Sequence, residues 1–444
     1  MNCESNLRVV LAVGLFLPGG LSRVALAANP LAASVTQLAA PTGPGAMGSM
    51  VVSSPDGAHW LSWLEPDRGA IAAPPGAPPM GGISMAQEEY AFKCARFDPV
   101  GRRWGEAHLI AHGPGWFINW EDFPALAATR NRLAAAWLVG TRAGEEHGDY
   151  AGYHVEYSTS NDAGKSWSTP QPITGESSRT SFIALQAMAD GRFMAAWLDG
   201  RERAEKRTTL YSRIIGDSGP DLLVDASTCG CCTLSFIPTA GGGVMLAYRG
   251  RTNEEIRDMR VSRFAGGKWS APRPLHADGW MIPACPDNGP QLAISGGNIA
   301  AAWFTAANGQ PRVYLARTQA GGRDFADPAV IDLGRAAGRV DSILLPDGTA
   351  LVTWIENSSK IREGGIYLRA QSSDGVLSAP VLLASTASSR ATGVPRITLL
   401  PDSVPAQFLL CYTRDSEPLQ VVTALVTVES LVAKAELVTR NGQD

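Results

Sequence analysis

Arginine and carboxylate side chains recur in the irregular segments of this 444-residue chain, where they could bind a charged ligand. The arginines are Arg142, Arg179, Arg201, Arg249, Arg251, Arg257, Arg339, Arg390 and Arg396, and the carboxylates are Glu121, Asp122, Asp199, Glu254, Glu255, Asp258, Asp287 and Asp341. Guanidinium groups that converge would bind a carboxylate or another anion, because the planar fork donates two parallel hydrogen bonds to it. The alternative is that each arginine is solvated or pairs with a nearby acid, which is the commoner fate of a single arginine.

From these residues we predict ligand-binding and catalytic candidates. The binding candidates are Arg142, Arg201, Arg249, Arg251, Arg257, Arg339 and Arg396, with Trp120 and Trp280 as aromatic faces for a sugar ring. The catalytic candidates are Asp199, Asp258, Glu255 and Tyr367, because glycoside hydrolysis needs a carboxylic acid and a second group as nucleophile or base. No spacing in the sequence selects among them. The tryptophans could equally fill space between structural units, since large aromatics are mostly structural.

Cysteines make a second cluster, which comprises Cys229, Cys231, Cys232 and, in a later segment, Cys285. In an exported chain, a disulfide between the two segments is one interpretation. A thiolate site for copper(I) or zinc, with His147, His154 or His276 nearby, is a second, and free thiols are a third. Cys94 and Cys411 lie in apolar runs and are predicted to be small buried groups. The sequence does not identify a cofactor.

A repeated β-structure must position these residues. A short apolar strand that ends in an aromatic residue recurs seven times, at Trp63, Trp137, Trp197, Tyr248, Trp303, Trp354 and Tyr412. Spacings of roughly 50 to 75 residues are typical of propellers and solenoids. We therefore predict an all-β fold, a β-propeller of four-stranded antiparallel blades, seven by repeat count. A β-sandwich is the alternative fold. The segment 37–41 is predicted to close the ring against the last blade.

Meander topology sorts the loops onto two rims. The tight turns, such as those at Asp190-Gly191 and 346–348, fall on one rim. The loops after the seven recurring strands and the loops between blades fall on the other, so the charged and cysteine-rich segments share that rim. Function is expected there, because binding residues concentrate in irregular loops on a rigid scaffold.

The stretch YSTSNDAGKSW contains the pattern Ser-x-Asp-x-Gly-x-x-Trp from Ser160 to Trp167. It resembles, without a gap, the Asp-box (BNR repeat) of sialidases and related β-propeller proteins. The resemblance implies a hairpin at a blade periphery that does no chemistry, and six blades as the alternative count. It also implies an exo-sialidase-like glycoside hydrolase as the candidate enzyme, with a tyrosine nucleophile helped by Glu and an Asp as acid. The segment 45–54 lacks the arginine with which sialidases contact the sialate carboxylate.

Four further segments resemble a group of exported bacterial propellers described as sialidase-like, which carry the CxCC loop. They are TCGCC (228–232), YRGRTNEEIRDM (248–259), DGWMIPACPDNGP (278–290) and GRVDS (338–342). This resemblance implies a propeller fold and export, and it leaves the chemistry open.

The net charge limits the class of partner, and the N-terminal segment predicts the location of the protein. A net charge of −4 and a pI near 5.9 argue against a nucleic-acid partner. Arg8, the apolar run 9–18 and Ala25-Leu26-Ala27 predict a signal peptide over residues 1–27, followed by one β-propeller domain over 28–444. The apolar run is too short to span a bilayer. We therefore expect a periplasmic or secreted protein without a transmembrane segment once the signal is removed.

Together these patterns predict an exported propeller that binds an anionic glycan or a related small ligand on its arginine-rich face. The sequence leaves open whether the protein also hydrolyses that ligand. A non-catalytic binding or assembly protein that docks a protein partner, and a metal-handling protein that uses the cysteine-rich loop, are the alternatives.

Overall fold

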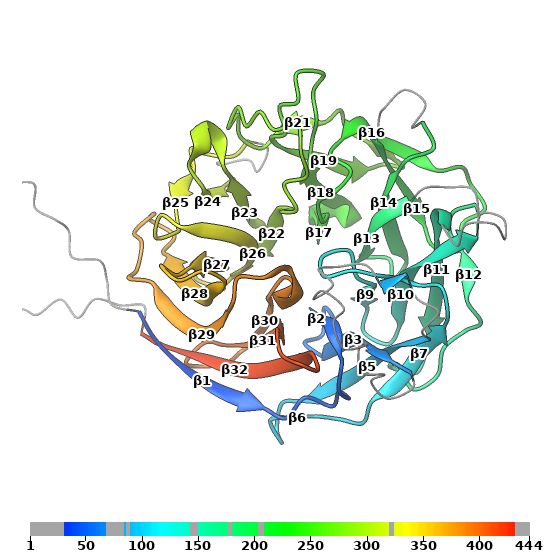
Figure 1. Cartoon of the computed structure of the whole chain (residues 1–444), viewed down its shortest axis with the longest axis horizontal. Helices are drawn as coiled ribbons and strands as arrows, with labels where there is room; N and C mark the ends of the chain where they lie inside the picture. Colours follow the sequence, from blue (N-terminus) through cyan, green and yellow to red (C-terminus); the bar gives the residue numbers. More distant parts are fainter. Residues whose placement is uncertain are drawn as a thin grey trace, which may run out of the picture.

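The computed structural model describes residues 31–67, 84–85, 89–142, 150–175, 180–202, 208–318 and 324–430. Several predictions fall outside these residues: the signal peptide 1–27, Arg179, His147 and the side chain of Arg142. Seven antiparallel sheets surround a common axis, so the seven-bladed propeller predicted from the repeat is confirmed (Figure 1). No helix in the described part of the chain is long and apolar enough to cross a membrane.

The first four blades follow the chain from β2 onward, each with its innermost strand first. Blade 1 contains β2 (Met47–Ser53), β3 (His59–Pro66), β5 (Tyr90–Asp98), β6 (Arg103–Trp104) and β7 (His108–Gly113). Blade 2 contains β9 (Ala125–Ala128), β10 (Leu133–Arg142), β11 (Tyr150–Ser160) and β12 (Gln171–Pro172). Blade 3 contains β13 (Thr180–Ala187), β14 (Phe193–Asp199), β15 (Thr208–Ile214) and β16 (Leu222–Thr228). Blade 4 contains β17 (Ser235–Pro238), β18 (Val244–Arg249), β19 (Met259–Ala265), β20 (Lys268–Trp269) and β21 (Arg273–Pro274).

The last three blades complete the ring. Blade 5 contains β22 (Gln291–Ser295), β23 (Asn298–Thr305), β24 (Arg312–Arg317) and β25 (Ala329–Val330). Blade 6 contains β26 (Ala336–Leu344), β27 (Ala350–Asn357), β28 (Glu363–Gln371) and β29 (Val381–Ala387). Blade 7 contains β30 (Arg396–Leu400), β31 (Gln407–Arg414), β32 (Gln420–Ser430) and, outermost, β1 (Ala32–Leu38). A short pair, β4 (Ser84–Met85) with β8 (Phe117–Ile118), and the 3-10 turns η2 (Ala240–Gly242), η3 (Ala307–Gly309) and η4 (Arg390–Thr392) lie between blades or strands.

The ring closes through β1, which pairs antiparallel with β32 from Ala32↔Ser430 to Leu38↔Thr423. The predicted closing strand at 37–41 overlaps β1 at its end only. Pairing starts five residues earlier, because the strand continues back along β32 as far as Ala32 and ends at Leu38. A strand from the N-terminus therefore completes a blade made from the C-terminus.

The recurring apolar strands form the second strand of every blade. Their alanines at 134–136, 195–196 and 300–302 are fully buried, as are Trp63, Trp197, Trp303 and Trp354. Each blade face packs on the next blade, so a strand covered on both sides has room for small side chains and one large aromatic anchor. This packing fixes where the second strands end and hence where the loops that follow them begin.

The Asp-box pattern forms the predicted hairpin between β11 and β12. Ser160 Oγ donates to Asp162 Oδ1 (2.8 Å), and Gly164 N donates to Ser160 Oγ (2.9 Å). Asp162 also accepts Ser166 N and Oγ, and these hydrogen bonds lower the pKa of its carboxyl to about 2. Gly164 has φ +89°, and Trp167 Nε1 donates back to its carbonyl (3.1 Å). The hairpin is a self-contained structural turn.

Two rims result from this topology. We call the rim formed by the segments 114–124, 229–234, 276–290, 331–335 and 388–395 the loop rim, and the opposite one, with the turns at 54–58, 129–132, 188–192, 239–243 and 345–349, the hairpin rim. Thr228 bridges to Gly250, and Ser227 Oγ donates to the carbonyl of Arg251 (2.8 Å). These contacts place the cysteine-rich loop beside the loop after β18.

Candidate functional site

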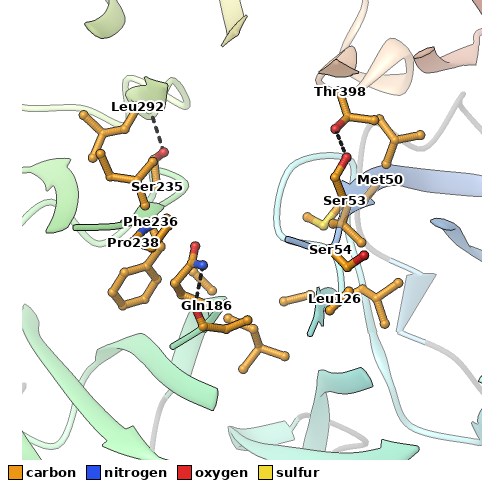
Figure 2. A pocket seen from close by; sticks show the side chains of 18 of the residues that line it. Met50, Ser53, Ser54, Leu126, Gln186, Ser235, Phe236, Pro238, Leu292 and Thr398 are labelled. Carbon is orange, nitrogen blue, oxygen red and sulfur yellow. Dashed lines mark hydrogen bonds between the residues drawn. The ribbon is translucent and has the colours of Figure 1, made fainter. Parts of the chain in front are cut away.

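A cavity of about 1270 Å³ runs along the propeller axis. Its wall is built from the innermost strands β2, β9, β13, β17, β22, β26 and β30. Figure 2 shows the mixture of groups that face it, including Leu126, Gln186, Ser235 and Leu292. Ser235 Oγ accepts the amide of Leu292 (2.9 Å), which ties blades 4 and 5 together at the wall. Aliphatic and small polar side chains both line this wall.

Charged residues mark both ends of the cavity. Arg130, Arg132 and Asp190 line the hairpin-rim end, and Glu121, Asp122, Asp341 and Arg396 line the loop-rim end. The second group is buried, with residue exposures of 3%, 3%, 7% and 8% in that order. Burying four ionisable groups around one cavity mouth costs free energy unless each group is paired within the protein or contacts a bound ligand.

Arg396 is the least satisfied of the four. Its Nε is buried without a hydrogen-bond partner among the residues that the structure describes. Its guanidinium lies over the ring of Phe123, 5.7 Å from the centroid. Burial raises the pKa of Asp341 and the charge of Arg396 opposes that shift, but the Asp341 carboxylate accepts the backbone amides of Ser342 and Ile397 (2.8 Å each). Arg396 therefore lines the cavity as a cation whose buried Nε donor has no partner in the described structure.

Glu121 presents a complementary group at the same mouth. Its Oε1 is buried and has no hydrogen-bond partner in the described structure. Burial, reinforced by the negative charge of Asp287, raises the pKa of Glu121 well above its usual value, although Arg339 and Arg396 oppose the shift. Burial thus favours the neutral, protonated carboxyl, which can donate a hydrogen bond.

Asp122 fixes the shape of the mouth. Both carboxylate oxygens accept the backbone amide of Phe182 at 2.9 Å, a residue held at φ +50° at the start of blade 3. Burial raises the pKa of Asp122 to about 7, while the bond from Phe182 lowers it. This acid bridges blades 2 and 3 at the cavity entrance.

Trp120 lies between two arginines above the mouth. The guanidinium carbon of Arg339 is 4.7 Å from the ring centroid and that of Arg390 is 5.6 Å away. Arg339 also donates to the carbonyl of Ser389 (2.5 Å), and Arg390 pairs with Asp287 (3.0 Å). The structure thus brings together the predicted residues Trp120, Arg339 and Arg396. Trp120 is 6% exposed, which fits the packing interpretation better than an open sugar platform.

A second group of predicted residues lies on the rim of blade 4. Arg249 is 1% exposed and donates to the carbonyls of Asn288, Arg257 and Phe304. Its guanidinium also stacks over Trp280, 4.9 Å from the centroid. These contacts place Arg249 and Trp280 in the framework that holds the loop 276–290.

Glu255 lies between two of the predicted arginines. Arg251 donates to its carboxylate from Nε at 3.0 Å, and Arg257 donates at 2.8 Å. Asp258 accepts the amides of Gly279 and Trp280 at 2.9 Å and so anchors the same loop. Glu255 and Asp258 therefore have protein partners and do not line the axial cavity.

The remaining catalytic candidates are spread over blades 3 and 6. Asp199 is fully buried, accepts Trp197 Nε1 (2.9 Å), and pairs with Arg201, which also contacts Asp221 (2.8 Å). Tyr367 lies on β28 and stacks on Trp354, with centroids 5.7 Å apart. The structure does not bring Asp199 or Tyr367 to the lining of the axial cavity.

The Trp197–Asp199 bond belongs to a repeated device that the sequence displays as Trp-x-acid. Trp63 Nε1 donates to Glu65 (2.7 Å), and Trp354 Nε1 donates to Glu356 (2.6 Å). In blade 2 the corresponding position is Val139, and Trp137 Nε1 is buried without a partner among the described residues. The carboxylates two residues after the recurring tryptophans therefore serve the fold.

The four clustered cysteines meet at the loop rim. Cys229 Sγ lies 3.5 Å from Cys231 Sγ and 3.9 Å from Cys232 Sγ. The Sγ atoms of Cys231 and Cys285 and a carboxylate oxygen of Asp287 lie within 4.8 Å of one another. Hydrogen bonds from the neighbouring thiols lower the pKa of Cys229, and the charges of Arg257 and Arg249 act in the same direction. All six described cysteines are free thiols, and Cys94 and Cys411 are buried as predicted.

The predicted histidine contributions to a metal site lie elsewhere in the described structure. His154 is near Glu156 (3.6 Å), and His276 is near Asp278 (2.7 Å) and the ring of Trp303. Neither residue joins the cysteine cluster.

Sequence reasoning singled out neither Glu121 nor Asn288 as a site residue. Glu121 differs from the other buried carboxylates in having a buried oxygen without a partner in the described structure, which no local sequence pattern reveals. Asn288 joins the two groups, because its carbonyl accepts Arg249 and its Oδ1 accepts the amide of Arg339 (2.6 Å). Its position three residues after Cys285 was the available signal.

Comparison with known proteins gives architecture alone. No family model matches the sequence, and no curated protein matches it. A protein of unknown function from Dyadobacter fermentans shares 14% identity over 89% of this chain and 98% of its own, with a TM-score of 0.49. The NanB sialidase of Streptococcus pneumoniae shares 11% over 91% and 71%, with a TM-score of 0.44. A GH93 α-L-arabinofuranosidase of Fusarium graminearum shares 12% over 89% and 97%, with a TM-score of 0.47. The protein is a β-propeller with seven blades and one complete Asp-box hairpin.

Proposed function

We propose that this protein binds an acidic saccharide at the loop-rim end of its axial cavity. The observation that carries the proposal is the pair of unsatisfied buried groups there, Arg396 Nε and Glu121 Oε1. A buried donor or acceptor without a partner costs about 1–3 kcal/mol, and more when it is charged. A ligand that supplies both partners recovers that cost on binding.

Arg396 selects an anion. A ligand carboxylate can accept two parallel hydrogen bonds from the guanidinium, whose buried Nε has no partner among the described residues. Glu121 adds a neutral donor and acceptor beside it, because burial keeps its pKa high. A carboxylate next to a hydroxyl group, as in sugar acids, matches this pair.

The cavity wall suits a carbohydrate. Ser53, Ser54, Gln186, Ser235 and Thr398 provide hydroxyl and amide groups along its length (Figure 2). Aliphatic side chains, such as those of Leu126 and Leu292, separate them. Sugars present alternating hydroxyl and C–H surfaces, and binding sites for small ligands combine apolar walls with a few polar groups.

Hydrolysis of the bound saccharide is the second candidate, and Glu121 favours it. A general acid for glycosidic cleavage needs a raised pKa, and burial shifts the pKa of Glu121 in that direction. Asp287, whose charge contributes to the raised pKa of Glu121, is a candidate for the second carboxylate. A protein that only binds its ligand would use the same mouth without turnover.

Calorimetric titration with a panel of uronic and sialic acids and their neutral parent sugars tests binding. We expect an acidic sugar to bind and its neutral parent to bind more weakly. Arg396→Met should weaken binding of the acid by about 150- to 25,000-fold, which corresponds to the loss of two charge-assisted hydrogen bonds at about 1.5–3 kcal/mol each. The affinity of Arg396→Lys, which keeps the positive charge but not the planar fork, should lie between that of the parent protein and that of Arg396→Met.

Arg273→Met is the matched control, because Arg273 lies on the outer strand β21 and its side chain is half exposed. Equal affinity of Arg396→Met and the parent protein would refute the site, as would failure of every acidic sugar to bind the folded protein. Glu121→Gln separates the two candidates, because it keeps a neutral hydrogen-bonding group but cannot donate a proton to a leaving group. Turnover that falls by about 100- to 10,000-fold with affinity retained would assign Glu121 as the general acid.

A further inference from the structure

The cysteine cluster lies beside the saccharide mouth and has no part in the function proposed above. Cys229, Cys231 and Cys232 come from the loop between β16 and β17, and Cys285 comes from the loop before β22. Cys229 and Cys232 are each 1% exposed, whereas Cys285 is exposed. Three thiols from one four-residue turn and a fourth from a neighbouring blade therefore converge from different directions.

The backbone holds the three nearby thiols in place. The amide of Cys229 donates to the carbonyl of Arg249 (3.0 Å), which ties the turn to the end of β18. A Cβ at position 230 would come 2.8 Å from Thr208 Oγ1, so glycine lets the turn pack against β15. The Cys-Gly-Cys-Cys sequence thus turns its three sulfurs toward one point.

The spacing of the sulfurs fits thiolates that share one ion. Tetrahedral ligands about 2.3 Å from a zinc or similar ion lie about 3.8 Å apart, whereas a disulfide requires about 2.05 Å. The two measured separations from Cys229 are 3.5 and 3.9 Å. Cys285 and Asp287 approach Cys231 to within 4.8 Å and can complete the set from the adjacent loop.

Positive charge compensates the cluster. Arg257 donates from a guanidinium nitrogen to Cys229 Sγ at 3.2 Å, and Arg257 is 7% exposed. The buried guanidinium of Arg249 contributes a second positive charge nearby. An ion with a single or double positive charge, bound by three or four thiolates, leaves a net negative site, and these two arginines offset it.

We propose that Cys229, Cys231 and Cys232 bind one thiophilic metal ion, copper(I) or zinc(II), with Cys285 or Asp287 as the additional ligand. Soft thiolates select these ions over magnesium, calcium and manganese. Three thiolates alone suit copper(I), and a fourth ligand suits tetrahedral zinc(II). The ion would fasten the entry loops of blades 4 and 5 together.

Metal analysis of the full-length protein, purified under reducing conditions without chelators, tests the site. The metal-depleted protein is then titrated separately with zinc(II) and with copper(I) against chromophoric competitors. We expect one ion per chain. Cys229→Ser and Cys232→Ser should each lower the affinity by more than about 100-fold, because groups that only orient a ligand are already worth about 10- to 100-fold.

Cys94→Ala is the matched control, since it removes a buried thiol from β5 on another blade and should leave the affinity unchanged. Cys285→Ser and Asp287→Asn identify the additional ligand: a loss with zinc but not with copper(I) would assign four-coordinate zinc and three-coordinate copper. Alkylation of the unmutated protein gives a readout that does not depend on mutant folding. A bound ion should protect Cys231 from iodoacetamide, and it should also protect Cys285 where Cys285 is the additional ligand.

Two results would overturn the proposal. One is a metal-free protein whose mass is two hydrogen atoms lower per bridge, which would show that these cysteines form disulfides. The other is a reduced protein that binds neither ion more tightly than its Cys229→Ser variant.

Discussion

Replacing Glu356 with alanine should destabilise blade 6 strongly, although the residue faces neither the saccharide mouth nor the cysteine cluster. Its carboxylate accepts Trp354 Nε1 (2.6 Å), the amide of Leu333 (3.3 Å) and the amide of Arg335 (2.5 Å). One side chain thus connects the second strand of blade 6 to the segment that leads in from blade 5.

The three donors differ in what happens after the substitution. Trp354 is fully buried, so its indole N–H would lose its partner without gaining water, at a cost of about 1–3 kcal/mol. The amides of Leu333 and Arg335 belong to exposed residues and would be hydrated after the substitution. The loss of each of these two hydrogen bonds should therefore cost about 0.5–1.5 kcal/mol. The sum is about 2–6 kcal/mol, a large share of the roughly 5–15 kcal/mol that stabilises a typical protein.

Urea unfolding followed by tryptophan fluorescence measures this loss. Glu363→Ala is the control, because its side chain is 59% exposed, and its ion pair with Lys360 should be worth at most about 1 kcal/mol. In a double-mutant cycle, Trp354→Phe and Glu356→Ala should couple by about 1 kcal/mol or more. A Glu356→Ala loss no larger than that of Glu363→Ala, or additive single effects, would refute the Trp-x-acid reasoning.

Two further predictions concern pH and processing. The folded-state pKa of Asp122 is raised to about 7 from 3.8, so the folded protein keeps a proton that the unfolded chain has lost, and stability falls as pH rises between these values. Asp122→Asn should reduce the pH dependence of the free energy of unfolding by up to about 1.4 kcal/mol per pH unit. Urea unfolding between about pH 5 and 7 measures this difference. Parallel plots of unfolding free energy against pH for the two proteins would contradict the raised pKa of Asp122. Cleavage after Ala27 should give an exported chain that begins at Ala28, and N-terminal sequencing of the periplasmic or secreted fraction checks this. An unprocessed Met1 in that fraction would count against it.

The propeller could be predicted because its determinants are local and repeated. An apolar strand with buried alanines and a terminal aromatic must lie between two blades, and seven copies give seven blades. The Asp-box hairpin is equally local, because Ser160, Asp162 and Gly164 interact within a few residues. The prediction that the arginines and cysteines share one rim followed from the meander topology alone, because successive connections in a blade alternate between the two rims.

The site could be predicted only in part, because its chemistry depends on long-range contacts. Arg249 and Arg396 look alike in the sequence, yet the carbonyls of Asn288 and Phe304 satisfy Arg249, whereas Arg396 keeps a buried donor without a partner in the described structure. Asp199 was a catalytic candidate by position, and its carboxylate instead accepts an indole N–H two residues away. The recurrence of Trp-x-acid was visible in the sequence, but its meaning required the structure.

The shared last blade has a topological consequence. Because Ala32 pairs with Ser430, the chain enters and leaves the ring at neighbouring points on its circumference. A surface anchor or fusion partner at either end would hold the disc by its edge and leave both rims open to solvent. A chain truncated before Gln420 would lack β32, the strand with which β1 pairs. The ring of blades can therefore close only when the last strand of the chain is present.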